Sequence, residues 1–437
     1  MAAPHSSGVE LRVTRRLPTS KSRVAWYVVA LLTAVYALNI ADRYVISTLI
    51  EPIKLDLGLS DSSIGLLTGV ALAIFYVGAG LPLAVLADRT NRRTLIAVSL
   101  AAWSGMTAVC GLTHSFWQLL LARIGVGIGE AGGTPASHAL ISDYFPRQRR
   151  AFALSVYSVG ASLGSMLGSS AGYASDAWGW RSAFLLLAIP GIALALLLRI
   201  TVREPRRGAL DPQVSLDLAP FTATLRHLIR SRALLHCLIG GTLYTFWAWG
   251  LMWWTPSYLV RSHHMNLGEA GGKLALMHGI GGTIVLLATS ELMRRMGGRD
   301  PRAVPWFVAV AIGAGTLPSI VAYSSHNTSL TLAMLWLFIP LSYANFGPTF
   351  ALVQNLCPPA MRAQGVAVLL FAANIANLIL APQLVGIASD LLASRFGAES
   401  LRIALLPLAF TGFWAATHYW LCGRHLRDDL PAHEPRS

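Results

Sequence analysis

Four ionisable residues lie inside apolar stretches of the chain that are long enough to cross a lipid bilayer: Asp42, Arg43, Arg123 and Glu130. An Asp, Lys or Arg at the centre of a membrane-spanning helix costs roughly 2.5–3.5 kcal/mol. Four such groups facing lipid would cost roughly 10–14 kcal/mol, which is comparable with the whole stability of a typical protein. They are therefore expected to face one another or a water-filled cavity, and to mark the path of an ion or a substrate. The sequence indicates a transporter.

The composition also indicates a membrane protein. The 437 residues are 54% hydrophobic and only 12% charged, whereas a soluble domain has about 25% charged residues. A helix needs about 20 residues to cross the hydrocarbon. The runs that lack Asp, Glu, Lys and Arg are residues 24–41, 62–87, 95–122, 151–175, 182–198, 233–260, 274–290, 303–361, 363–389 and 403–423. The run 303–361 provides two helices and residues 125–141 an interrupted one, so we predict an all-α membrane protein with twelve transmembrane helices.

Basic residues gather at both ends of the chain and in the loops that follow the even-numbered predicted helices. They lie mainly within residues 12–23, 89–93, 147–150, 199–232, 294–302, 362 and 424–436. The positive-inside rule then places both termini in the cytoplasm. The net charge of +14 reflects this orientation, so we expect no nucleic-acid partner. Arg outnumbers Lys 31 to 3, which points to a GC-rich bacterial genome, so we expect this membrane protein in the bacterial inner (plasma) membrane.

A long hydrophilic stretch divides the predicted helices six and six. We predict an N-terminal tail, a first half, a linker, a second half and a C-terminal tail, at residues 1–23, 24–201, 202–232, 233–423 and 424–437. The halves share a plan, because residues 149–176 and 362–390 each run from Arg through a helix of small residues to Ala-Ser-Asp. Duplicated halves place a substrate site between them near the midplane, with access alternating by rocking.

Three motifs resemble those of a known family. Residues 84–93 (AVLADRTNRR) resemble the helix 2–3 signature of the major facilitator superfamily, and residues 123–131 (RIGVGIGEA) resemble its helix 4 signature. Together with residues 39–43 (NIADR), they are similar to the spinster-like branch. The resemblance implies the major facilitator fold of two six-helix halves and proton-coupled transport. It also implies a substrate related to the lysolipids and sphingoid phosphates that animal members carry.

The predicted first and fourth helices concentrate the polar candidates. Arg123 and Glu130 lie within 20° of each other around the fourth helix and about 10 Å apart along it. Thr134 lies four residues further on the same helix. On the first helix, Asn39 and Arg43 share a face. In the family that the chain resembles, these two helices line the central cavity, so we predict that these side chains contact substrate or ions there.

Asp42 is rotated by 100° from Arg43 around the first helix. We interpret Asp42 and Glu130 as proton acceptors, because burial favours a neutral carboxyl whereas a nearby Arg favours a charged one. Arg43 and Arg123 are then candidates for binding a substrate anion, since a guanidinium offers two parallel hydrogen bonds to a phosphate or carboxylate. The alternative is a static ion-pair network that only holds the helices together.

The second half offers aromatic and amide candidates. Tyr244 and Trp247 share a face of the predicted seventh helix and could form an aromatic wall of the cavity, although Trp and Tyr also gather at membrane interfaces. The other polar candidates in this half are Tyr343, Asn345, Asn374 and Asn377. Intramembrane Asn also bonds neighbouring helices, which is the alternative role.

A basic cluster after the second predicted helix suggests a gate on the cytoplasmic side. Its candidates are Asp88, Arg89, Arg92 and Arg93, with Arg149 as a possible partner. Asp88 would close that side by pairing with a helix end or with an Arg such as Arg149. The alternative for the Arg residues is a purely topogenic role, in which they only fix the orientation of the loop.

We therefore expect a secondary active transporter, coupled to protons, that moves an amphiphilic organic anion such as a lysolipid or a sphingoid phosphate. The alternative is a proton-coupled importer of small carboxylates or aromatic acids. We expect no enzyme activity, because the sequence has no G-x-x-x-x-G-K-[ST], H-E-x-x-H or G-x-S-x-G run. We also expect no cofactor or metal, with protons, membrane lipid and the solute as partners of a monomer.

Overall fold

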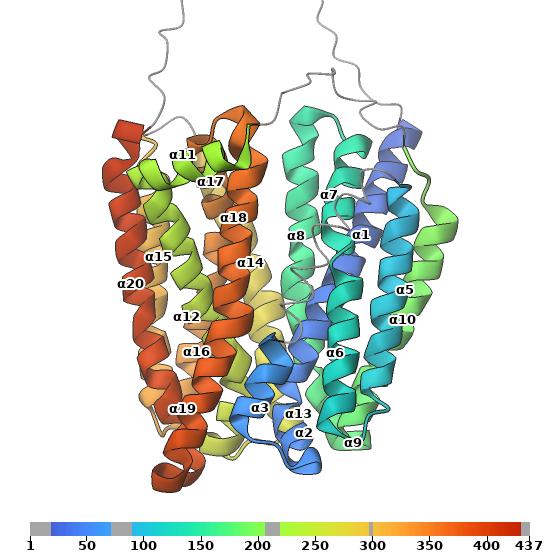
Figure 1. Cartoon of the computed structure of the whole chain (residues 1–437), viewed down its shortest axis with the longest axis vertical. Helices are drawn as coiled ribbons and strands as arrows, with labels where there is room; N and C mark the ends of the chain where they lie inside the picture. Colours follow the sequence, from blue (N-terminus) through green and yellow to red (C-terminus); the bar gives the residue numbers. More distant parts are fainter. Residues whose placement is uncertain (1–18, 71–89, 206–218, 297–299, 430–437) are drawn as a thin grey trace, which may run out of the picture.

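The computed structural model describes residues 19–70, 90–205, 219–296 and 300–429. Within these residues, every regular element is a helix (Figure 1). Nine helical stretches of this described part are long and apolar enough to cross a membrane. The all-α fold class predicted from the sequence is confirmed, although much of the predicted second helix lies outside the described residues.

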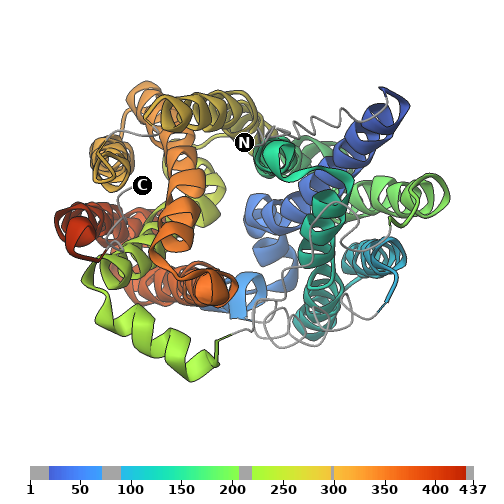
Figure 2. The same ribbon diagram turned by 90° about the horizontal axis from the view of Figure 1, so that it is seen from above.

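The helices stand in two groups, side by side (Figures 1 and 2). The first group contains α1 (Thr19–Thr48), α2 (Ile50–Leu57), α3 (Asp61–Gly65), η1 (Leu66–Val70), α5 (Arg92–Cys110), α6 (Phe116–Glu130), α7 (Gly133–Tyr144), α8 (Arg147–Ser169), α9 (Ala171–Trp178) and α10 (Trp180–Thr201).

The second group begins with the short helix α11 and ends with the long helix α20. It contains α11 (Phe221–Arg230), α12 (Arg232–His263), α13 (Leu267–Leu276), η2 (Met277–Gly282), α14 (Thr283–Met296), α15 (Ala303–Ser324), α16 (Thr328–Ser342), η3 (Tyr343–Asn345), α17 (Phe346–Leu356), η4 (Pro359–Met361), α18 (Arg362–Asn374), η5 (Ile375–Leu380), α19 (Ala381–Phe396), η6 (Gly397–Glu399) and α20 (Ser400–Asp429).

Successive spans alternate in direction, so the bundle has two distinct ends. We call the end at which α1 begins, α20 ends and α11 lies the α11 end, at the top of Figure 1. We call the opposite end, which carries α2 and α3, the α2 end. The two groups pack together toward the α2 end, where α3 contacts α19 and α9 contacts α13.

Polar side chains mark where several helices begin. Ser60, Asn91, Ser115, Ser231 and Asn327 each precede a helix and accept a hydrogen bond from a backbone N–H of its first turn. Such caps satisfy backbone donors that have no partner within the helix. They fix the ends of spans that apolar composition alone would leave undefined.

Within the described residues, three π-helical turns occur: η1, η2 and η5. Such turns insert an extra residue into an α-helix and are frequent at functional sites. They belong to the predicted second, eighth and eleventh helices, which lie along the boundary between the two groups. The interruption expected within residues 125–141 falls between Glu130, the last residue of α6, and Gly133, the first residue of α7.

The stretch 202–232, predicted as a linker, includes helix α11. Thr224 and Leu228 of α11 are buried, and the Thr224 hydroxyl donates a hydrogen bond to Gln364 of α18. The linker is therefore partly folded onto the second group. We propose that the two halves end and begin at the limits predicted from the sequence, residues 201 and 233.

Candidate functional site

A cavity of about 230 Å³ lies between the two groups of helices. Both groups line it, with α1, α7 and α8 on one side and α12, α17, α18 and η5 on the other. Seven of the residues predicted from the sequence line this cavity: Asn39, Arg43, Thr134, Tyr244, Asn345, Asn374 and Asn377. The structure thus brings polar candidates of the first and fourth predicted helices together with four from the second half.

Arg43 forms an ion pair with Glu130 at the wall of this cavity. Its Nε and Nη2 atoms both lie 2.9 Å from Oε2 of Glu130. The Arg43 side chain is 14% exposed, whereas that of Glu130 is 0% exposed. The pair joins α1 to α6 and places a cation at the cavity surface with its counter-ion directly behind it. Within the described residues, Oε1 of Glu130 is buried and has no hydrogen-bond partner.

Asp42 and Arg123 lie behind this pair, away from the cavity. Oγ1 of Thr107 on α5 donates a 2.6 Å hydrogen bond to Oδ1 of Asp42. Arg123 Nη1 donates to the backbone oxygen of Asp42 at 3.1 Å. Both side chains are buried. The four charged residues therefore lie in two layers, with Arg43 and Glu130 at the cavity and Asp42 and Arg123 behind them. Asp42 is rotated by 100° from Arg43 around α1, which explains why Arg43 lines the cavity and Asp42 does not.

Besides Arg123, two further predicted substrate-binding residues do not line the cavity. Trp247 is buried in the second group, and its Nε1 lies 3.3 Å from Oγ of Ser319. Tyr343 is also buried, and its hydroxyl lies 3.0 Å from Nδ1 of His278 and 3.2 Å from Oγ of Ser165. Neither is among the residues that line the cavity. Tyr343 instead contacts the other group of helices through Ser165.

The structure adds an aromatic barrier that the sequence did not predict as part of the site. Tyr44, Trp249 and Trp253 line the cavity, and the rings of Tyr44 and Trp253 stack 6.0 Å apart across the boundary between the groups. The hydroxyl of Ser47 donates to the backbone oxygen of Trp253 at 2.5 Å. These contacts close the cavity toward the α2 end. Tyr44 directly follows Arg43, but no pattern in the sequence shows which aromatic ring it faces.

Amide groups give the second group a polar surface inside the cavity. Asn345, Asn374 and Asn377 all line it. Nε1 of Trp253 donates to Oδ1 of Asn377 at 3.1 Å, and Thr349 donates to Oδ1 of Asn345 at 2.5 Å. The cavity wall opposite Arg43 therefore combines apolar surface with amide groups that the neighbouring side chains hold in place.

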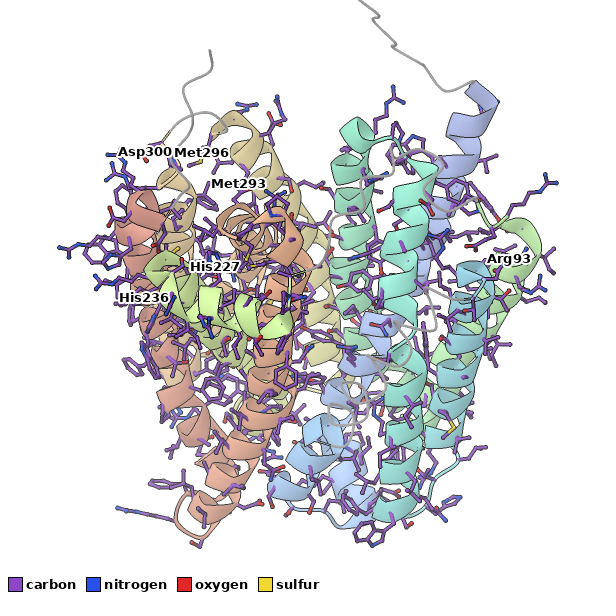
Figure 3. All side chains as sticks on the ribbon, turned by 45° about the horizontal axis from the view of Figure 1, so that its top comes forward. Arg93, His227, His236, Met293, Met296 and Asp300 are labelled. Carbon is purple, nitrogen blue, oxygen red and sulfur yellow. The ribbon has the colours of Figure 1, made fainter. Side chains whose placement is uncertain are left out.

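The predicted gate residues lie near the α11 end, where described. Arg92 forms ion pairs with Asp143 at 2.6 Å and with Glu204 at 2.8 Å, and the backbone N–H of Arg93 donates to Glu204. Figure 3 shows Arg93 at the outer edge of the first group. Arg149 is exposed at the start of α8. These described contacts lie within the first group, and Asp88 and Arg89 lie outside the described residues.

Replacing Arg92 by Ala is expected to destabilise the first group of helices. The side chain is 6% exposed and holds the ends of α5, α7 and α10 together, so its removal leaves two carboxylates without their cation. We expect a loss of about 2–3 kcal/mol, measured by thermal unfolding in detergent. Arg294→Ala, at a side chain that is 73% exposed, is the control and should change stability by less than about 0.5 kcal/mol.

The fold and the site define a multi-pass membrane transporter, with two helical halves around a central cavity. The sequence profile of the Major Facilitator Superfamily matches residues 32–382. The chain belongs to this superfamily.

Its relatives include an MFS-type efflux pump of Mycolicibacterium smegmatis, which is 34% identical over 93% of this chain and 95% of the pump. The sphingosine-1-phosphate transporter SPNS2 of Danio rerio is 26% identical, over 83% of this chain and 76% of that protein. A crystal structure of a bacterial homolog of the human lysosomal transporter Spinster, inward-facing and unoccupied, superposes with a TM-score of 0.81 at 28% identity. The match covers 94% of this chain and 99% of that one. The predicted family, fold class and lack of an enzymatic role are confirmed.

Proposed function

We propose that the protein is a proton-coupled secondary transporter of an organic anion that has an apolar body. The observation that carries this proposal is the Arg43–Glu130 pair, in which the cation lines the cavity and its partner is fully buried. A buried charge normally needs a partner. Arg43 can therefore bind a solute anion from the cavity when Glu130 is neutralised.

Proton binding at Glu130 would supply that neutralisation. A protonated Glu130 no longer holds Arg43 by charge, so an anionic head group takes the guanidinium through two parallel hydrogen bonds. Loss of the proton restores the ion pair and expels the anion. One proton on Glu130 and one anion on Arg43 then move together. Transport of the anion is thereby coupled to the proton, although the proton and the anion do not touch. We propose Asp42, behind Arg43, as a second proton acceptor.

The rest of the cavity suggests the body of the solute. Ile40, Phe350, Leu369 and Leu370 offer apolar surface, and an apolar chain or ring buried there gains roughly 25 cal/mol per Å². An amphiphilic anion, such as a lysolipid or a sphingoid phosphate, satisfies both parts of the cavity. Among the relatives, the zebrafish protein bears the name sphingosine-1-phosphate transporter, which supports the same class.

The size of the cavity favours the second candidate, an importer of small carboxylates or aromatic acids. Its volume of about 230 Å³ is below the roughly 300–1,000 Å³ of pockets that enclose drug-sized ligands. A small aromatic acid fits within it, whereas a lysolipid tail would extend beyond it. The Tyr44 and Trp253 rings at the closed end would stack on an aromatic solute.

We further propose a monomer in the bacterial inner membrane, with the α11 end in the cytoplasm. The basic residues at that end support this orientation, because positive charge is retained on the cytoplasmic side. The cavity then faces the cytoplasm in this structure, since the two halves meet toward the α2 end.

Transport into proteoliposomes under an imposed pH gradient tests the proposal. The solutes compared are lysophosphatidate, sphingosine phosphate and benzoate, each with and without the gradient. We expect gradient-driven uptake of at least one of them, and Arg43→Gln should reduce it by roughly 10- to 100-fold through a loss of about 1.4–2.8 kcal/mol. Arg302→Gln, at a loop residue paired with Asp300, is the matched control. Uptake that ignores the gradient for every solute, or an active Arg43→Gln variant, contradicts the proposal.

A further inference from the structure

A five-residue motif occurs twice in the chain, once in each half. Residues 172–176 read Gly-Tyr-Ala-Ser-Asp and residues 386–390 read Gly-Ile-Ala-Ser-Asp. The first copy lies in α9 and the second in α19. Both copies lie toward the α2 end, and both contact the opposite half of the molecule. The cavity and its charges do not account for this repeat.

The second copy caps a helix that belongs to the first half. Oδ1 of Asp390 accepts the backbone N–H of Asp61 at 2.9 Å, and Oδ2 accepts that of Ser62 at 2.8 Å. These are the first two N–H groups of α3. The first N–H groups of a helix have no partner within it and carry partial positive charge, so a carboxylate there is stabilising.

The first copy makes the reciprocal contact. Oδ2 of Asp176 accepts the backbone N–H of Gly268 at 2.7 Å. Gly268 is the second residue of α13, which starts the eighth predicted span in the second half. Each half therefore supplies one Asp that caps the beginning of a span in the other half.

The glycine of each copy allows the two helices to touch through their backbones. A Cβ atom at Gly172 would lie 2.5 Å from the backbone oxygen of Leu267, and one at Gly386 would lie 2.5 Å from that of Asp61. Both distances are far below ordinary contact. The capped helices also have a glycine at the contact. A Cβ at Gly65 would meet Pro382 and Gln383, and one at Gly271 would meet Ser169.

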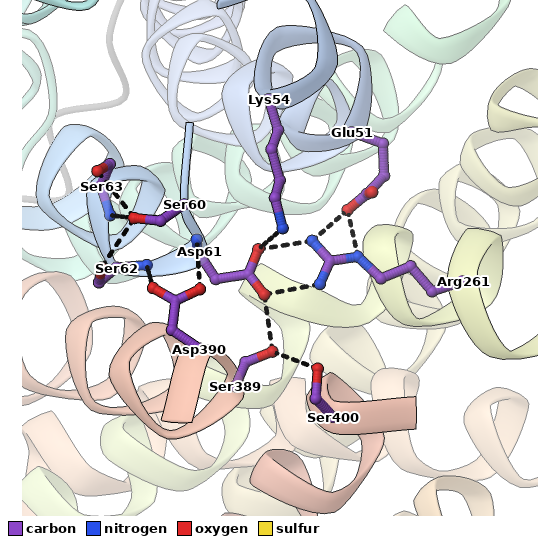
Figure 4. Close-up of polar contacts among 10 residues, drawn as sticks. All are labelled: Glu51, Lys54, Ser60, Asp61, Ser62, Ser63, Arg261, Ser389, Asp390 and Ser400. Carbon is purple, nitrogen blue, oxygen red and sulfur yellow. Dashed lines mark hydrogen bonds and ion pairs between the residues drawn. The ribbon is translucent and has the colours of Figure 1, made fainter. Parts of the chain in front are cut away.

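The contact made by the second copy is reinforced by a cluster of charges (Figure 4). The carboxylate of Asp61 accepts two hydrogen bonds of 2.7 Å from Arg261 of α12 and lies 2.6 Å from Nζ of Lys54. The hydroxyl of Ser389, next to Asp390, donates to Asp61 at 2.7 Å. Arg261 also pairs with Glu51 at 2.7 Å. Asp176 is exposed, and among the described residues it makes the single cap to Gly268.

We propose that the two Gly-x-Ala-Ser-Asp segments are latches that hold the α2 end of the bundle shut, and that both must release before the cavity opens on that side. Asp390 and Asp176 act as positioning residues across the boundary between the two groups of helices. The Asp390 latch is the stronger of the two, because the charge cluster around Asp61 reinforces it. The proposal rests on the rocking of the two halves that their duplication predicts. It does not depend on the identity of the solute or on proton coupling. A cap within one half would remain intact during such a motion. These caps join residues of different halves, so the motion must break them.

Distances between spin labels on the two halves test the latches. Labels at Leu112→Cys and Ala398→Cys would occupy exposed positions near the α2 end, one on each half. The native cysteines Cys110, Cys237, Cys357 and Cys422 are all buried, so they react slowly with the label. Pulsed electron resonance on the protein in lipid nanodiscs then gives the fractions of closed and open forms without any transport assay.

Asp390→Ala is expected to lower the ratio of closed to open forms by roughly tenfold, and Asp176→Ala by roughly threefold. The double variant should open further than either. Asp56→Ala is the matched control, because Asp56 is a carboxylate at the same end that pairs with Arg181 within its own half; it should leave the ratio unchanged.

A second set of variants keeps the test decisive if an alanine variant misfolds. Asp390→Asn retains the size of the side chain but removes its charge, and should shift the ratio less than Asp390→Ala. Gly386→Ala leaves Asp390 intact, but its Cβ would press on the backbone oxygen of Asp61, so it too should favour the open form. A distance distribution that matches Asp56→Ala in all of these variants would overturn the proposal. Shifted distances in a protein that transports none of the tested solutes would instead support the latches and count against the proposed function of the cavity.

Discussion

Glu130→Gln is expected to abolish uphill, pH-driven transport, with a fall of at least roughly 100-fold, or about 2.8 kcal/mol. The side chain is 0% exposed and its Oε2 holds Arg43. Gln has nearly the same shape and still accepts a hydrogen bond from Arg43, but it cannot carry a proton in one state and a charge in the other. The variant should therefore resemble the protonated state permanently.

This expectation separates coupling from binding. In the variant, Arg43 remains available to the solute anion, so exchange of labelled for unlabelled solute at equal pH should stay within about threefold of the parent rate. Uptake against a solute gradient should be lost. Both are measured in the same proteoliposomes. Glu291→Gln is the control, since the Glu291 side chain is exposed on α14 and, among the described residues, pairs with its helical neighbours Arg294 and Arg295. Uphill transport equal to that of the parent protein would contradict the role of Glu130.

The sequence predicted the fold well because the bilayer imposes a simple rule. A span must be helical and apolar over about 20 residues, so hydropathy and basic loops predict most of the architecture. The exceptions are local. The π-helical turns η1 and η2 contain glycine and η5 is followed by Ala381-Pro382, but Gly and Pro also occur in spans without such turns, so they did not predict these positions.

Several residues predicted from the sequence line the cavity, but their pairings were not predicted. Helical periodicity placed Arg123 and Glu130 on one face, yet Arg43 pairs with Glu130, and Arg123 instead bonds the backbone of Asp42. Which partner a buried charge finds depends on how each helix is rotated against its neighbours, and one sequence does not contain that information. Trp247 shows the same limit, since it shares a helix with Tyr244 but does not line the cavity.

For the repeat that ends in Ala-Ser-Asp, the sequence showed the pattern but not its structural role. That role is visible in the structure, where Asp176 and Asp390 each cap the beginning of a helix. A capped N–H group is a backbone atom, so no side-chain pattern in α3 or α13 marks it. Duplicated polar residues at the ends of spans therefore indicate a contact between halves, even where the partner is unmarked.

Arg123→Met is expected to lower the free energy of unfolding by about 3–5 kcal/mol. Arg123 is fully buried, and its guanidinium interacts electrostatically with the carboxylate of Asp42, which is 2% exposed. Removing Arg123 leaves that carboxylate without its cation. Adding Asp42→Asn removes the stranded charge, so the double variant should regain about 2 kcal/mol. Unfolding by denaturing detergent in mixed micelles measures the cycle, with Arg294→Met as the exposed control.

The same double variant decides between a static network and a proton path. If the charges only hold helices together, a neutral pair of similar volume replaces them without harm, and both stability and pH-driven uptake should return. If Asp42 carries a proton during transport, stability returns while uphill uptake remains lost, because Asn cannot titrate. We expect the second outcome. Recovery of uphill uptake together with stability would show that Asp42 and Arg123 serve the fold alone, and would leave the Arg43–Glu130 pair as the coupling element.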